Sequence, residues 1–174
     1  MVSADEITAI YLPLLQELKA VRPNLLCLFT VSPIRHLKDG LHGNQLSKAN
    51  LLIAIDQICS QMDFCHYFPS YEIMIDELRD YRFYADDMMH PSPLAIQYIW
   101  ECFCNCYFTP STLSFLKEWN KIRQGLAHRP FNPESEAYQT FLSQILLKIE
   151  DLKEKLPYLD VQKEIKLCQA QLKK

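Results

Sequence analysis

The sequence predicts an α/β fold with about two parallel strands, followed by several α-helices. One observation is a short apolar run at 24–31 (NLLCLFTV), bounded by proline on both sides, which is typical of a strand buried on both faces. Another is the helical spacing of apolar residues on either side of it, at 4–20 and 45–62. A second apolar run at 64–68 completes a strand–helix–strand unit. A right-handed crossover would pair its two strands in parallel.

The remaining elements follow from turn, capping and spacing patterns. Pro13 lies inside the first helix and is expected to bend it. The polar stretch 35–44 contains two of the three glycines and is expected to be an exposed loop. Capping residues and apolar spacing predict further helices at 71–81, 92–108, 111–129, 132–156 and 159–174. We therefore expect an α/β part over 1–108 and a helical extension packed on it over 109–174.

The composition excludes several function classes. A net charge of −3 makes the chain a poor candidate for binding nucleic acid or an anionic membrane surface. No apolar run approaches the roughly 20 residues that cross a bilayer. The N-terminal sequence MVSADEITAI lacks the basic and apolar regions of a signal peptide. Neither a GxGxxG nor a GxxxxGK loop occurs, so we expect no bound nucleotide cofactor.

The seven cysteines are expected to be reduced thiols, because their number is odd and no export signal precedes them. Cys102, Cys104 and Cys106 have the appearance of a ligand cluster. On a helix, however, Cys104 points to a different side from the other two. No second CxxC or histidine pair completes a tetrahedral set. We therefore expect no metal site.

Three polar residues follow the first predicted strand. Ser32, Arg35 and His36 lie just beyond its carboxyl end, where open α/β sheets bind their ligands. They are candidates for the rim of a substrate site. The alternative is that Ser32 turns the chain and Arg35 pairs with a carboxylate. Ser32 is a weak candidate nucleophile, because Pro33 follows it and a nucleophile elbow needs a tight, glycine-flanked turn.

Glu72 follows the second predicted strand. It is a candidate to orient a partner at the same rim. Alternatively, it is a first-turn glutamate that the helix dipole favours, with Ser70 as the N-cap. The capping interpretation is the favoured one.

Asp87 and His90 form an Asp-x-x-His pair immediately before a predicted helix. Pro91 biases His90 away from helical backbone angles, so the imidazole is expected to project from a loop. Asp87 can then accept the Nδ1 proton, which fixes the tautomer and leaves Nε2 available as a base. The alternative is a surface loop in which both residues cap backbone groups. Spacing alone favours that alternative, because the pattern is short.

Longer sequence strings around these residues are more specific to a protein family than the short Asp-x-x-His pattern is. They are TVSPIRHLKDGLHGNQLSKANLL, YFPSYEIMIDELRDYRFYADDMMHPS and AHRPFNP. In this order they closely resemble the GSCFA family, which is placed within the SGNH (GDSL-like) hydrolase superfamily. The resemblance implies a three-layer αβα hydrolase with a Ser-His-Asp site. It also implies that His90 is the general base and Asp87 its orienting carboxylate, with Asp86 a weaker candidate for the latter role.

The sequence departs from the family where the nucleophile should be. The Gly-Ser-Cys-Phe-Ala string that supplies the family's serine does not occur in this chain, and neither do the upstream Gly and Asn blocks of the oxyanion hole. We therefore expect 1–108 to be the C-terminal half of an SGNH-like domain. The isolated chain is expected to be inactive, and an ester or acylated-carbohydrate hydrolase when the N-terminal half is present. The alternative function is a non-catalytic helical interaction module.

Expectations about partners and location follow from this interpretation. An incomplete sheet has an unpaired edge, and unpaired edges invite strand pairing. We therefore expect self-association or pairing with an N-terminal half. The expected location is cytoplasmic, although a targeting signal could lie in such a half.

Overall fold

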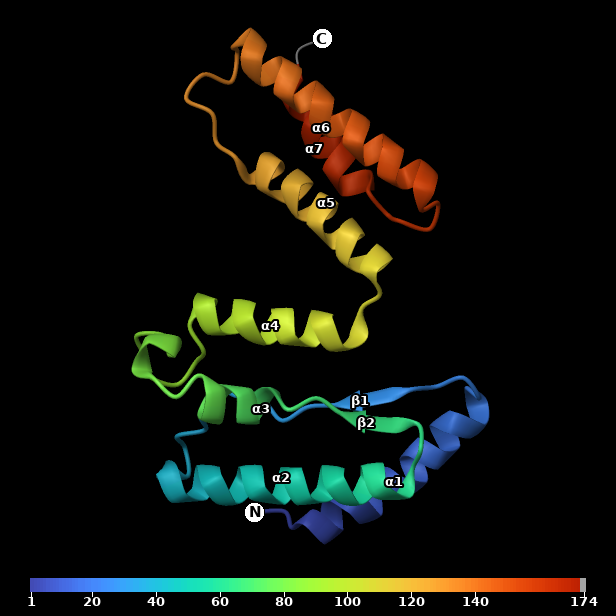
Figure 1. Cartoon of the computed structure of the whole chain (residues 1–174), viewed down its shortest axis with the longest axis vertical. Coiled ribbons are helices and arrows are strands. Elements are labelled where there is room, and N and C mark those ends of the chain that lie inside the picture. Colours follow the sequence, from blue (N-terminus) through green and yellow to red (C-terminus); the bar gives the residue numbers. More distant parts are fainter. Residues whose placement is uncertain (173–174) are drawn as a thin grey trace. The chain divides into compact units, whose positions relative to one another are not determined.

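The computed structural model describes residues 1–172, which are mostly helical and contain one small parallel sheet (Figure 1). The chain divides into two compact units, Met1–Tyr107 and Phe108–Lys174. The elements of the first unit are α1 (Ala4–Val21), β1 (Cys27–Phe29), α2 (Gly40–Gln61), β2 (Cys65–Tyr67), α3 (Ser70–Glu72), η1 (Ile73–Glu77), η2 (Tyr81–Phe83) and α4 (Pro93–Tyr107). Those of the second are α5 (Pro110–Ala127), α6 (Glu136–Lys155) and α7 (Gln162–Gln171).

The sheet of the first unit consists of β1 and β2, which pair in parallel with Cys27 opposite Cys65. This confirms the predicted parallel pairing, with α2 as the crossover. Figure 1 shows the two strands between α2 on one side and α4 on the other. Two cores result. Leu15, Ile58 and Phe64 pack between the sheet and the pair α1–α2, and Phe68, Met74 and Ala95 belong to the core beside α4.

The prediction that the first strand is buried on both faces was wrong. Cys27 and Phe29 pack against the core of α1 and α2. Leu26 and Leu28 are 72% and 40% exposed. Successive residues of a strand point to opposite faces, so the second face carries the exposed pair. Among residues 1–172, β1 has β2 on one edge and no strand on the other.

Two predicted element boundaries were also wrong. The predicted loop 35–44 ends at Gly40, where α2 begins with a residue in the left-handed region, φ 73°. That first turn, GLHGN, carries no apolar periodicity that could indicate a helix. The predicted helix 71–81 is instead α3 followed by the π-helical turn η1, which closes with Leu78 N–H donating to the Ile73 carbonyl at 3.0 Å. The wider turn packs Ile73, Met74 and Leu78 into one core.

Up to residue 172, the second unit is a set of three helices around its own core of Ile122, Ile145, Ile149, Leu152 and Val161. Helix α5 has Thr109 as its N-cap and a proline in its first turn, and α6 has Ser135 as its N-cap. The last helix starts three residues later than predicted, at Gln162, and its predicted end at 174 lies outside the described residues. Within the described residues, no helix combines the length and apolarity needed to span a bilayer.

Candidate active site

The Asp87–His90 segment is a closed loop before α4. An isolated antiparallel bridge joins Tyr84 to Pro91 at its base. Ala85 N–H donates to the His90 carbonyl at 2.8 Å, and Ser92 N–H donates to the Phe83 carbonyl at 2.7 Å. Because both ends are held by backbone hydrogen bonds, the loop has a defined shape although most of its side chains are exposed.

Within this loop Asp87 and His90 are in hydrogen-bond contact. His90 Nδ1 lies 2.6 Å from Asp87 Oδ2. The other carboxylate oxygen, Oδ1, accepts the backbone N–H groups of Met89 at 2.9 Å and His90 at 3.0 Å. Met88, which lies between Asp87 and Met89 in the chain, adopts a left-handed backbone with φ 58°. The carboxylate therefore has three donors that fix its orientation toward the ring.

The same hydrogen bonds set the charge of Asp87. The backbone N–H groups of His90 and Met89, and then the imidazole, lower the pKa of Asp87 to about 2. The carboxylate is therefore ionised at neutral pH and favours a proton on Nδ1. In that tautomer Nε2 carries the lone pair. The His90 side chain is 54% exposed, and Nε2 has no hydrogen-bond partner among residues 1–172. The arrangement can present a base to an approaching group.

Arg35 connects this loop to the carboxyl end of β1. Its backbone N–H donates to the Met89 carbonyl at 3.1 Å, and its guanidinium donates to the Met88 carbonyl at 3.2 Å. The guanidinium also lies over the Tyr84 ring, 4.0 Å from the centroid. No carboxylate of the described chain pairs with it, so the alternative of an Arg35 ion pair was wrong. Arg35 is thus on the same rim as the Asp87–His90 loop.

Ser32 and His36 have local structural roles. Ser32 Oγ accepts the Ile34 N–H at 3.3 Å, as in a turn, and its carbonyl accepts the Lys48 ammonium at 2.6 Å. His36 is tied to the start of α2, because its backbone N–H donates to Asn44 Oδ1 at 2.8 Å. Its Nε2 lies 3.1 Å from Asp39 Oδ2. Neither side chain is in hydrogen-bond contact with His90 in the described structure.

Glu72 lies in the first turn of α3, as the capping interpretation predicted, but its side chain contacts Tyr67. Both of its carboxylate oxygens accept the Tyr67 hydroxyl, at 3.0 and 2.8 Å. Burial and this carboxylate raise the pKa of Tyr67. Ser70 does not cap the helix, since Pro69 occupies the N-cap position. Instead the buried Ser70 hydroxyl donates to the Val31 carbonyl at 2.8 Å and lies 2.5 Å from Thr30 Oγ1.

The structure adds a residue that sequence reasoning missed. Lys48 on α2 is buried, and its ammonium donates to the Ser32 carbonyl and lies 5.5 Å from the centre of the Tyr71 ring. Burial lowers its pKa. A lysine in a helical sequence ordinarily indicates a solvated face, so no pattern marked it. Asp86, the weaker carboxylate candidate, is exposed and accepts no side-chain hydrogen bond in the described structure.

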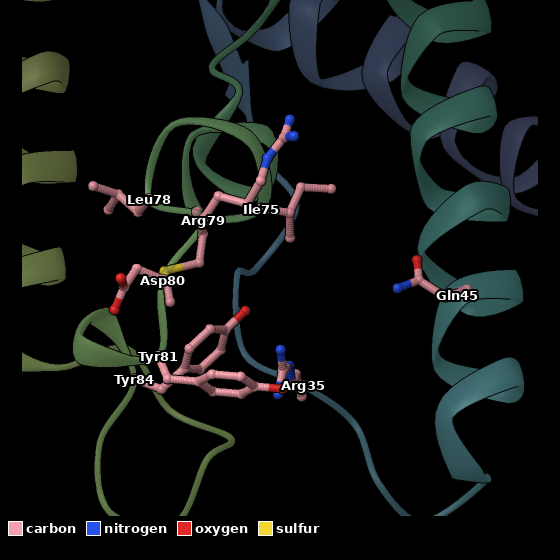
Figure 2. Close-up of a pocket in the computed structure, with 9 residues that line it drawn as sticks. Arg35, Gln45, Ile75, Leu78, Arg79, Asp80, Tyr81 and Tyr84 are labelled. Atoms are coloured by element: carbon pink, nitrogen blue, oxygen red, sulfur yellow. The ribbon is translucent and has the colours of Figure 1, made fainter.

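Two hollows flank this region. One, of about 330 Å³, lies beside Arg35 and Tyr84 (Figure 2). The other is an apolar groove of about 570 Å³ that includes Leu28 of β1, Pro91 and Trp100 of α4. No group of histidine, cysteine or acidic side chains in residues 1–172 is arranged to hold a metal ion.

Comparison with known proteins gives two matches to family models. The model described as GSCFA family matches residues 1–103. The model described as GSCFA domain protein, C-terminal domain, matches residues 119–174. No curated protein and no solved structure matches the chain. The first match covers all the residues of the candidate site.

Proposed function

The chain belongs to the GSCFA family, and we propose that its first unit supplies the base and the orienting carboxylate of an SGNH-type ester hydrolase. The observation that carries the proposal is the 2.6 Å contact between His90 Nδ1 and Asp87. Two backbone N–H groups fix the same carboxylate. A base oriented in this way is one half of the machinery of a serine hydrolase.

In the proposed reaction His90 Nε2 takes the proton of a serine hydroxyl while the serine oxygen attacks the ester carbonyl. The imidazolium then gives that proton to the leaving alcohol. Water, deprotonated by the same nitrogen, hydrolyses the acyl-serine. Asp87 stays ionised throughout and stabilises the imidazolium, for which its pKa of about 2 is suited.

The serine itself is proposed to come from outside these 174 residues. The sequence contains no Gly-Ser-Cys-Phe-Ala string, and the hydroxyl of Ser32 is engaged in its own turn. The surface that would receive such a segment is the open edge of β1 together with the apolar groove. Leu28, Ile96 and Trp100 on this surface are between 40% and 58% exposed. Parallel sheets are ordinarily covered on both faces, which supports a larger, three-layer αβα sheet domain completed there.

The substrate class that fits this reaction is a small ester or an acylated carbohydrate. The acidic composition supports no nucleic-acid partner. A cytoplasmic location stays part of the proposal. Self-association through the open edge of β1 is the competing way to cover that edge.

The test is an esterase assay on short p-nitrophenyl esters. The 174-residue chain alone should hydrolyse them no faster than the same concentration of free imidazole. Fusion or co-expression with the segment that carries the Gly-Ser-Cys-Phe-Ala string should produce turnover. Robust turnover by the isolated chain that survives His90→Ala would overturn the proposal, and Ser32→Ala would then be the next variant to assay.

A second candidate, a non-catalytic helical interaction module, is favoured by the second unit. Helices α5, α6 and α7 form their own core, and a separate family model matches residues 119–174, from within α5 onward. Phe131, Leu147 and Tyr158 in this unit are largely exposed. A folded, completed protein that hydrolyses no ester would favour this module over the hydrolase.

A further inference from the structure

The hollow beside Arg35, here called the Arg35 pocket, has a cationic side chain over apolar walls. Figure 2 shows Arg35 next to the ring of Tyr84, with Gln45 of α2 on the other side of the hollow. Met74, Ile75 and Leu78 supply apolar lining from the π-helical turn and its end. A pocket of this kind suits a ligand with an apolar body and a polar group.

The charges around the pocket are unevenly balanced. Arg79 pairs with Asp76 at 3.1 Å, and Asp80 pairs with Arg82 at 3.0 Å. Figure 2 shows the Arg79 guanidinium directed away from the rings of Tyr81 and Tyr84. Arg35 pairs with no carboxylate of the described residues. The lining therefore contains one cation that is not neutralised.

Arg35 is also held in place, and several of its N–H donors remain available to a ligand. Its guanidinium gives one hydrogen bond to a carbonyl and lies over an aromatic ring. A guanidinium has five N–H donors in a planar fork, which matches the two oxygens of a carboxylate or a phosphate. Across the hollow, the Tyr71 hydroxyl donates to Gln45 Oε1 at 2.8 Å, which orients the Gln45 amide and leaves its NH₂ as a donor.

We propose that the Arg35 pocket binds an oxyanion, a carboxylate or phosphate carried by an apolar or aromatic body, and that this group belongs to the substrate. Arg35 contacts the backbone of the Asp87–His90 loop, so the residue that would bind the anion is joined directly to the loop that carries the base. The assignment to substrate rests on the proposed function, whereas the binding itself does not. The pocket thus selects esters that bear a negative charge.

The test is a binding titration of the full 174-residue chain, followed by ¹H–¹⁵N NMR. Benzoate and phenyl phosphate are the anionic probes, and benzamide is the neutral probe of the same shape. We expect at least one anion to shift the Arg35 and Gln45 side-chain signals, with saturation near millimolar concentration, as small fragments bind. Benzamide should bind at least about tenfold more weakly. The stronger anion identifies the oxyanion type.

Variants separate binding from folding. Arg35→Gln should weaken anion binding by about tenfold or more, and Arg35→Lys by less, because lysine keeps the charge and loses the fork. Gln45→Leu, which leaves the loop contacts of Arg35 intact, should also weaken it. Arg22→Gln, outside the pocket, is the matched control and should change nothing.

His90→Ala should leave anion binding within about twofold while abolishing any turnover by the completed enzyme, so the two proposals fail separately. Equal binding of benzoate and benzamide would overturn the inference. So would unchanged anion binding in both Arg35→Gln and Gln45→Leu.

Discussion

The first unit contains two aspartate–histidine pairs, each three residues apart, and they are built differently. In the His36–Asp39 pair the carboxylate meets the outer ring nitrogen, Nε2, at 3.1 Å. In the Asp87–His90 pair it meets Nδ1 at 2.6 Å. The first arrangement uses the nitrogen that faces outward, and the second leaves it available. The same two residue types therefore give a surface contact in one loop and an oriented base in the other.

The carboxylates of the two pairs also differ in the hydrogen bonds that they accept. Asp87 also accepts two backbone N–H groups, whereas Asp39 makes no side-chain hydrogen bond to the helix that it precedes. Both pairs are about half exposed, so burial does not distinguish them. The backbone N–H donors to Asp87 distinguish the two pairs. Such donors hold a carboxylate in one orientation without the entropy cost of a second flexible side chain.

The largest expected effect separates the two histidines in the completed enzyme. His90→Ala should lower kcat for p-nitrophenyl acetate by ~10³-fold or more, because the serine loses its base. His36→Ala is the matched control and should stay within about threefold. Initial rates of the two purified variants decide the matter. Equal losses would mean that the loops act only through folding, and circular dichroism of both variants checks for that.

The next effect separates the two aspartates. Asp87→Asn keeps the shape of the side chain but removes the charge that selects the Nδ1–H tautomer. We expect kcat to fall by ~10²-fold or more, against a change within about twofold for Asp39→Asn. If Asp87→Asn retained full activity, the carboxylate would have no orienting role, and the 2.6 Å contact would be a loop-closing hydrogen bond.

The acid titration of Asp87 tests the same carboxylate without a substrate. Its pKa is lowered to about 2, so its contribution to stability is present above the ordinary aspartate value and is lost as the pH falls through about 2. The stability difference between the wild-type chain and Asp87→Asn should therefore shrink between about pH 4 and pH 2. Carboxyl ¹³C NMR should give a midpoint near 2, and an ordinary midpoint would contradict the backbone donors.

The part of the site that sequence predicted is the part built from neighbours in the chain. The Asp87–His90 contact spans three residues, and Pro91 biases the local backbone away from a helix, so the sequence offered the contact as a candidate. The spacing by itself favoured a loop that only caps backbone groups, and the longer family strings changed that weighting. The parallel pairing of the strands also followed from element order. The Thr30–Ser70 contact and the position of Arg35 beneath the loop join residues far apart in sequence. No local pattern encodes such contacts, because they depend on how the elements pack.

Apolar spacing also predicted some local structures wrongly. The stretch after β2 has apolar residues at helical spacing, yet it forms a π-helical turn. A wider turn moves Leu78 by part of a helical turn and lets it reach the core. The start of α2 was predicted wrongly for the opposite reason. Its first turn is polar, so no apolar spacing indicates a helix there. The contact between Asn44 and the His36 backbone, which helps to fix this turn, depends on the folded structure.

The smallest expected effect disturbs the His36–Asp39 pair alone. A Cβ at Gly43 would lie 2.8 Å from the Asp39 Cβ, so Gly43→Ala must displace Asp39. Alanine is also the better helix former by about 1 kcal/mol, and Asp39 lies at an exposed helix end where the chain can yield. We therefore expect a net change in unfolding free energy within about 1 kcal/mol, measured by urea denaturation.

The His36 ring signals of Gly43→Ala should shift in NMR while those of His90 stay in place, and the esterase activity of the completed enzyme should stay within about twofold. A large loss of activity from Gly43→Ala would show that the His36 loop supports the site, and the division between the two pairs would not hold.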